Sequence, residues 1–149
     1  MYILRNSLAA ILAVLLLFNP LIADCEKGDC TDGQGTFTWP DGSTYTGLWK
    51  SDMQHGKGTM VWANGDRYTG QWRNGRRHGR GVYVKKDGSR YDGEWFEGYP
   101  HGRGVMVWPG GNLYRGGWKK GKRHGDGVFV TSSGHTLTGR WVDDKFVEK

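Results

Sequence analysis

The sequence predicts an all-β fold: an elongated single-layer curved antiparallel sheet of stacked β-hairpin repeats, preceded by a cleavable N-terminal helix. Three observations predict the sheet. The 149 residues include 26 glycines, which weaken helices, and 8 tryptophans and 7 tyrosines, which need burial. Tyr, Gly and Trp recur with a constant period of 23 residues, as from Tyr45 to Tyr68, which is typical of a repeat array. Short segments ending in glycine separate the copies, as hairpin loops do.

The composition also excludes other classes of protein. An aromatic content of 13% argues against a disordered chain, and the glycines do not recur at every third residue as collagen requires. The 21 Lys and Arg exceed the 15 Asp and Glu, which gives a net charge of +6. Such an excess favours polyanionic partners only weakly, and a solvated basic surface is the alternative.

Residues 1–23 differ in composition from the rest of the chain. Arg5 precedes an apolar run over residues 8–18, and Pro20 follows that run. The run is shorter than the ~20 residues that span a bilayer. We therefore expect a signal peptide, cleaved after Ala23, and a chain exported to the periplasm or secreted. An uncleaved N-terminal membrane anchor is an alternative.

Cys25 and Cys30 are the only cysteines, and both follow the proposed cleavage site. In an exported chain, a lone pair with this spacing is expected to form one disulfide that closes a short loop. A lipid anchor is an alternative, because residues 21–25 resemble the lipobox of bacterial lipoproteins, from which Asp24 departs. We assign residues 24–44 to an N-terminal cap that includes a partial repeat.

The repeat units consist of Tyr, Gly and Trp at alternate positions, followed by a His-Gly pair. Units begin at residues 45, 68, 91, 114 and 137, so the array covers residues 45–149. Leu137 replaces Tyr in the last unit, and both ends are predicted to act as caps. The structural repeat residues are Tyr45, Trp49, Tyr68, Trp72, Tyr91, Trp95, Tyr114, Trp118 and Trp141.

The turns set the predicted register of the strands. Residues 40–42 read Pro-Asp-Gly, which fits a three-residue hairpin loop with glycine in the left-handed conformation. This loop places Gly35 opposite Gly47. For the other connection, residues 50–55, we expect a six-residue loop, which places each repeat Trp opposite the glycine that follows the histidine.

These pairings predict continuous rows of side chains, because successive residues of a strand point to opposite faces. On one face, a row of glycines lies between a row of Tyr, Phe and Met and a row that alternates Trp with Gly. The glycine row allows the sheet to curl toward this face, which gives an aromatic-lined trough. The opposite face carries valines beside charged residues and is predicted to be half wetted.

The repeated Tyr, Gly, Trp, His-Gly and Gly pattern resembles the MORN (membrane occupation and recognition nexus) repeat family. The resemblance covers residues 45–149, with a partial unit from about residue 33. Asp52 and Asp144 depart from it where other units have glycine. The resemblance implies an elongated hairpin array that acts as a scaffold for protein contacts, self-association or membrane attachment. The Cys-bearing N-terminus is similar to that of exported bacterial MORN-repeat proteins.

No enzymatic, cofactor or metal site is predicted. The four histidines of the His-Gly pairs occupy one position per unit, so neighbours lie about 10 Å apart, whereas two ligands of one zinc ion approach within about 4 Å. A loop-closing hydrogen bond is the role that we expect for them. The sequence shows no recognisable serine or cysteine nucleophile site. The four histidines are His55, His78, His101 and His124.

Two sets of residues are candidate contact sites. Basic residues cluster around two of the longer loops, which are expected to project from one edge of the sheet about 20 Å apart. Three tryptophans precede turns and lie outside the Trp/Gly row. The candidate anionic-surface contacts are Arg73, Arg76, Arg77, Arg80, Lys119, Lys120, Lys122 and Arg123, and the candidate aromatic contact surface is Trp39, Trp62 and Trp108.

The sequence therefore predicts a non-catalytic exported repeat scaffold that mediates protein–protein or envelope-surface contacts. The alternative is binding of anionic phospholipid headgroups through the basic loops, and a third is an accessory module for an enzyme on another chain. Self-association is a further prediction, because terminal strands offer unpaired backbone edges. Nucleic acid is not an expected partner, because no base-reading element is visible.

Overall fold

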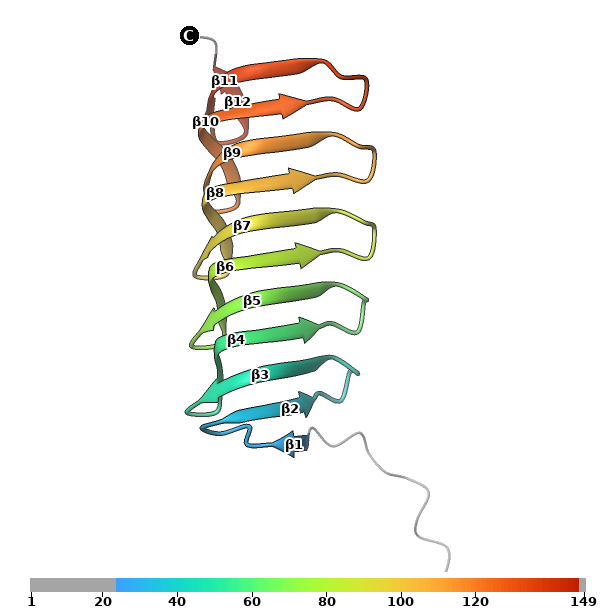
Figure 1. Ribbon diagram of the computed structural model, residues 1–149, viewed down its shortest axis with the longest axis vertical. Coiled ribbons are helices and arrows are strands. Elements are labelled where there is room, and N and C mark those ends of the chain that lie inside the picture. The colour runs from blue at the N-terminus through green and yellow to red at the C-terminus, as the bar shows by residue number, and fades with distance from the viewer. Residues whose placement is uncertain (1–23, 148–149) are drawn as a thin grey trace, which may run out of the picture.

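The computed structural model describes residues 24–147, and the predicted signal peptide with its helix lies outside them. This part of the chain is one open antiparallel sheet in which the strands follow one another in chain order (Figure 1). No helix within it is long and apolar enough to cross a membrane. The strands are β1 (Asp24–Gly28), β2 (Gln34–Thr38), β3 (Thr44–Lys50), β4 (Met53–Val61), β5 (Arg67–Arg73), β6 (Arg76–Val84), β7 (Arg90–Phe96), β8 (Tyr99–Val107), β9 (Leu113–Lys119), β10 (Lys122–Val130), β11 (Thr136–Val142) and β12 (Lys145–Val147).

The connections between repeat units have the predicted three-residue loops. In the first, the amide of Gly42 donates to the carbonyl of Trp39 at 2.9 Å, and Gly42 has φ of +87°. Gly35 consequently lies opposite Gly47. Pro40 and Asp41 favour this turn. Glycine adopts the positive φ of its last position at little cost because it has no side chain. The predicted register is therefore confirmed on this side of each strand.

The other connections differ from the predicted six-residue loop. Each is a two-residue turn with positive φ at both residues, such as Asn74 at 49° and Gly75 at 72°. The surplus residues form a bulge in the second strand, because Gly70 pairs with Gly81 whereas the next residue of β5 pairs with His78. Within this hairpin Trp72 therefore lies opposite Arg77 and not opposite Gly79, whereas on its other side it has the predicted pairing with Gly56. An Asn-Gly turn has the twist of the strands it joins, which favours the tight turn over a wide loop.

The core is a continuous row of alternating Tyr and Trp rings on one face of the sheet. Tyr68 has 0% of its surface exposed and meets two indoles edge-on, Trp72 of its own unit at 5.1 Å and Trp95 of the next unit at 5.2 Å between ring centroids. Its hydroxyl donates to the carbonyl of Gln71 at 2.9 Å. The indole of Trp95 donates to the carbonyl of Gly81 at 3.1 Å. The Tyr68 and Trp95 rings thus bury their apolar surface while their polar atoms keep a partner.

The glycine row makes this packing sterically feasible. A Cβ on Gly81 would overlap the ring of Tyr68, and a Cβ on Gly70 would lie 2.5 Å from the Cα of Gly81. Because the Tyr68 hydroxyl reaches a carbonyl only three residues along its own strand, the strand bends over the ring. The sheet therefore curves toward the aromatic face along the glycine row, and the strands turn back at the edge that carries the two-residue turns (Figure 1).

Both ends of the array carry additional contacts. At the N-terminus, the sulfur atoms of Cys25 and Cys30 lie at disulfide distance, 2.09 Å. The carbonyl of Thr31, in the loop after this pair, accepts from the amide of Asp52 at 3.1 Å, which ties the cap to the first two-residue turn. At the C-terminus, Phe146 packs on Trp141 at 5.3 Å. Its ring lies against the last glycine of the row, so it supplies an aromatic ring in the unit that begins with leucine in place of tyrosine.

We predict that Gly81→Ala lowers the free energy of unfolding by about 2 to 3 kcal/mol, because the added methyl group displaces the Tyr68 ring. The matched control is Gly110→Ala, since Gly110 has ordinary φ and nothing within 4 Å of its would-be Cβ. That change should stay within about 0.5 kcal/mol. Urea unfolding followed by tryptophan fluorescence measures both, and equal losses would contradict the role of the glycine row.

Candidate interaction surfaces

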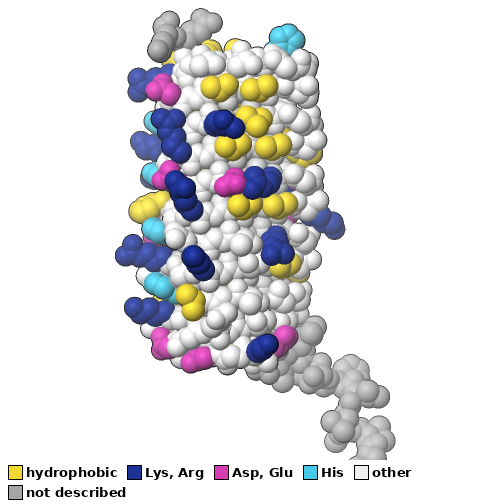
Figure 2. Space-filling view, viewed as in Figure 1, with side chains coloured by type: hydrophobic (Ala, Val, Ile, Leu, Met, Phe, Trp, Pro, Cys, Tyr) yellow, Lys and Arg dark blue, Asp and Glu magenta, His cyan; other side chains and the backbone are white. Residues whose placement is uncertain are grey.

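The edge of the sheet that carries the two-residue turns, here called the turn edge, displays most of the predicted basic residues. Arg73 and Arg76 flank the β5–β6 turn, and Lys119, Lys120 and Lys122 lie at the β9–β10 turn, all of them exposed. The two turns are four strands apart, or about 19 Å. Figure 2 shows columns of Lys, Arg and His side chains along one edge of the array.

Arg80 is exposed on a different surface, the outer face opposite the core. It lies opposite Glu94 in the register and lines a groove of about 1040 Å³ on that face. Arg76 is on the turn edge but has a partner, because its Nη1 lies 2.6 Å from Oε2 of Glu97. Figure 2 shows the outer face, on which short rows of hydrophobic side chains alternate with charged ones. The sequence predicts a half-wetted outer face, but it does not predict the groove on that face.

Arg77 and Arg123, predicted as surface contacts, point instead into the aromatic face. The guanidinium of Arg77 lies 4.3 Å from the ring centroid of Trp95, and that of Arg123 lies 4.2 Å from Trp141. Nη2 of Arg77 also donates to the carbonyl of Gly98 at 2.8 Å. The bulge at the His-Gly pair causes this inward orientation, because it changes which residue faces the repeat Trp. The signal that sequence reasoning missed is that both arginines occupy the same repeat position, two units apart.

Burial shifts the pKa values of both Arg77 and the neighbouring Tyr83. Desolvation lowers the pKa of the Arg77 guanidinium below its ordinary value. The same surroundings raise the pKa of Tyr83 to about 12, first through burial and then through its hydrogen bond to Asp66. The guanidinium lies 5.0 Å from the Tyr83 ring. A cation enclosed by aromatic faces stabilises the interior of the array.

The side chains that remain half-buried on the inner face form a surface that we call the trough. Trp62 packs edge-on against Tyr83 at 5.7 Å, and Trp108 packs on Phe129 at 6.0 Å. A groove of about 490 Å³ opens beside Trp108. All three predicted contact tryptophans belong to the trough, whose members are Phe37, Trp39, Trp62, Tyr83, Met106, Trp108 and Phe129.

Comparison with protein-family models identifies the family of the chain. The family model for the MORN repeat matches residues 31–44, 45–67, 68–90, 91–113 and 114–136. The chain belongs to the MORN repeat family. MORN repeats are protein- and membrane-interaction modules, and the family is a non-catalytic repeat module. No curated protein matches the chain.

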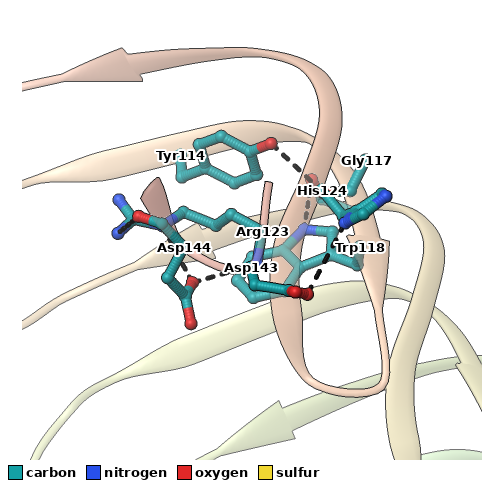
Figure 3. A network of polar contacts seen from close by, with 8 residues as sticks. Tyr114, Gly117, Trp118, Arg123, His124, Asp143 and Asp144 are labelled. Atoms are coloured by element: carbon teal, nitrogen blue, oxygen red, sulfur yellow. Dashed lines mark hydrogen bonds and ion pairs between the residues drawn. The ribbon is translucent and has the colours of Figure 1, made fainter. Parts of the chain in front are cut away.

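Two histidines of this MORN array, His78 and His124, lie near carboxylates in the turn of the next unit. Nδ1 of His124 lies 3.7 Å from Oδ1 of Asp143, and Nδ1 of His78 lies 4.0 Å from Oε1 of Glu97 (Figure 3 shows the first pair). Within residues 24–147, Nδ1 of His55, His78 and His124 is buried without a hydrogen-bond partner, so the expected loop-closing bond is not made at these atoms. No group of three or more His, Cys, Asp or Glu in this part of the chain has a metal-binding arrangement.

We predict that Arg77→Gln lowers the free energy of unfolding by about 2 kcal/mol, because it removes a desolvated cation–π contact and a hydrogen bond to Gly98. Glutamine already occupies the equivalent position at Gln54. The control is Arg76→Gln at an exposed ion pair, which should change stability by less than about 0.5 kcal/mol. Thermal or urea unfolding distinguishes them, and equal effects would refute an interior role for Arg77.

Proposed function

We propose that this MORN chain is a non-catalytic exported scaffold that binds another protein along its trough. The observation that carries the proposal is the accessible groove beside Trp108, in an inner face where half-buried aromatic rings lie against the buried Tyr and Trp core. Tryptophan and tyrosine in partly enclosed pockets are the residues that most often anchor protein interfaces. Within residues 24–147 the sheet is a single layer, and neither face is covered by a second element.

The geometry of the array suits an extended partner segment. Equivalent positions recur about every 10 Å along the sheet, because each unit contributes two strands. Trp62 and Trp108 occupy equivalent positions two units apart, so an extended segment of several residues contacts both. Repeat proteins use such surfaces for binding, since each unit adds similar contacts in line.

Export of the chain is part of the proposal and is supported by two features. The first is the composition of residues 1–23, with a basic residue before a short apolar run. The second is the pairing of Cys25 with Cys30, since disulfides persist mainly in oxidising compartments. On this basis the partner is a protein of the cell envelope or of the medium.

Site-specific photo-crosslinking in the producing cell tests the protein-binding trough. A photoreactive amino acid at position 108 or 62 should give an adduct of one defined mass, because the side chain faces the partner. The matched control is the same amino acid at position 105, a half-buried valine on the outer face. Adducts of equal yield at positions 105 and 108, or adducts only at 105, would contradict binding in the trough.

A second function, binding of an anionic membrane surface, is favoured by the turn edge. Lys119, Lys120 and Lys122 are exposed at one turn, and each cation near an anionic leaflet contributes about 1 kcal/mol. Within the described residues none of the three forms an ion pair, whereas Arg76 is held by Glu97. The attraction is therefore concentrated at the β9–β10 turn.

Vesicle sedimentation tests this second function. Replacing Lys119, Lys120 and Lys122 by Glu should lower partitioning onto phosphatidylserine-containing vesicles by at least about 100-fold, since three contributions of about 1 kcal/mol are lost. The control makes the same charge change on the outer face, with Arg67, Arg103 and Arg115 replaced by Glu. Equal binding of the unchanged chain to neutral vesicles, or equal losses in both variants, would exclude a specific membrane contact at this turn.

A further inference from the structure

One position in each unit faces the repeat Trp and points into the trough. In the two-residue-turn hairpins, the residue opposite the repeat Trp is half-buried, and its identity differs from unit to unit. The Tyr and Trp residues of the core scarcely vary along the array, whereas this position carries both polar and apolar residues. The five residues in chain order are Gln54, Arg77, Pro100, Arg123 and Phe146.

Where this residue is arginine, it fills a site built by the following unit. The guanidinium of Arg77 stacks on Trp95 at 4.3 Å and donates to the carbonyl of Gly98 at 2.8 Å. The second arginine, Arg123, stacks on Trp141 at 4.2 Å and donates to the carbonyl of Asp144 at 2.9 Å. Each site therefore offers the face of an indole and the carbonyl of the second turn residue.

The unit between these two has the same site without its arginine. Pro100 holds the position, and its short ring cannot extend to the next indole as an arginine does. The corresponding indole is Trp118 and the corresponding turn residue is Gly121, and both line the groove of about 490 Å³ beside Trp108. The backbone is unchanged, because the amide of Gly121 donates to the carbonyl of Pro100 at 2.9 Å, as that of Gly98 does to Arg77 at 3.0 Å. In residues 24–147 no Lys or Arg stacks on Trp118.

The charges around the groove also suit a cation. Both hydrogen bonds from Arg123 to the carboxylate of Asp144 end on Oδ1, which leaves Oδ2 as an acceptor (Figure 3). Asp144 lines the groove together with Arg123. Because Asp144 neutralises the charge of the Arg123 guanidinium, Arg123 does not strongly repel a second guanidinium in the groove. A planar guanidinium stacks on an indole while donating in its own plane, which an ammonium does not do equally well.

We propose that the groove at Trp118 binds the guanidinium of an arginine side chain on the partner protein, which completes the arginine–indole stack missing at Pro100. This inference rests on the proposed protein-binding function and specifies the chemistry that the partner presents. The inserted arginine stacks on the Trp118 indole and donates to the Gly121 carbonyl. The array thus contains two filled copies of its own binding site, at Arg77 and Arg123.

The test is an NMR titration of the full chain, purified from its producing cell, with N-acetylarginine amide as the probe. N-acetylcitrulline amide is the matched probe, with nearly the same shape and no charge. The indole N–H signal of Trp118, which donates to the carbonyl of Gly104, is assigned with the W118F variant. We expect a saturable shift with arginine that is several-fold larger than the shift with citrulline.

Two variants separate this site from the rest of the trough. Pro100→Arg supplies the arginine from within the chain, so the response of Trp118 to the probe should be lost. Gln54→Arg makes the corresponding change two units away, over Trp72, and should leave the Trp118 response intact. The comparison between the two probes in the unchanged chain does not depend on how either variant folds.

Equal shifts with arginine and citrulline, no shift with either, or an undiminished response in a folded Pro100→Arg variant would overturn the arginine site. If crosslinking at position 108 were retained despite such a result, the proposal that a protein binds in the trough would still hold. A positive titration without crosslinking at either trough position would place the failure in the proposed function.

Discussion

The edge-on packing of each repeat tyrosine between two indoles, over glycines that carry no side chain, is the interaction on which the structure depends. Tyr68 meets Trp72 of its own unit and Trp95 of the next, so one ring couples neighbouring units. The ring also occupies the space of the absent side chain at Gly81, which bends the strand over it. A single layer of sheet thereby obtains a buried core without a second layer to cover it.

The register and the curvature could be predicted from the sequence because they depend on residues with narrow conformational preferences. Pro-Asp-Gly specifies one hairpin loop, and the spacing from that loop to Gly35 and Gly47 fixes the pairing. The two-residue turns were missed although Asn74-Gly75 is a recognised hairpin dipeptide, because other units have Ser51-Asp52 or Asp143-Asp144 there. Those residues adopt positive φ only because the flanking strands hold them.

The position of the functional residues was harder to predict, because it follows from a bulge that simple alternation does not show. Two extra residues at each His-Gly pair change the residue that faces the repeat Trp. Arg77 therefore enters the aromatic interior while its neighbour Arg76 stays in solvent. A cluster that appears continuous in the sequence is therefore divided among three surfaces: the aromatic interior, the turn edge and the outer face.

This division separates the requirements of folding from those of recognition. Substitutions at the Tyr, Gly and Trp positions disrupt the core, because each Tyr ring packs against the Trp rings of its own unit and of the next. The residue opposite the repeat Trp is less constrained, because glutamine, arginine, proline and phenylalanine all occupy it in one chain, although Arg77 adds stability where it is present. The array thus varies at this one position per unit while its fold stays the same. In the arginine site that we propose, Pro100 leaves the Trp118 indole without a stacked guanidinium, between two units whose Arg77 and Arg123 stack on the equivalent indoles.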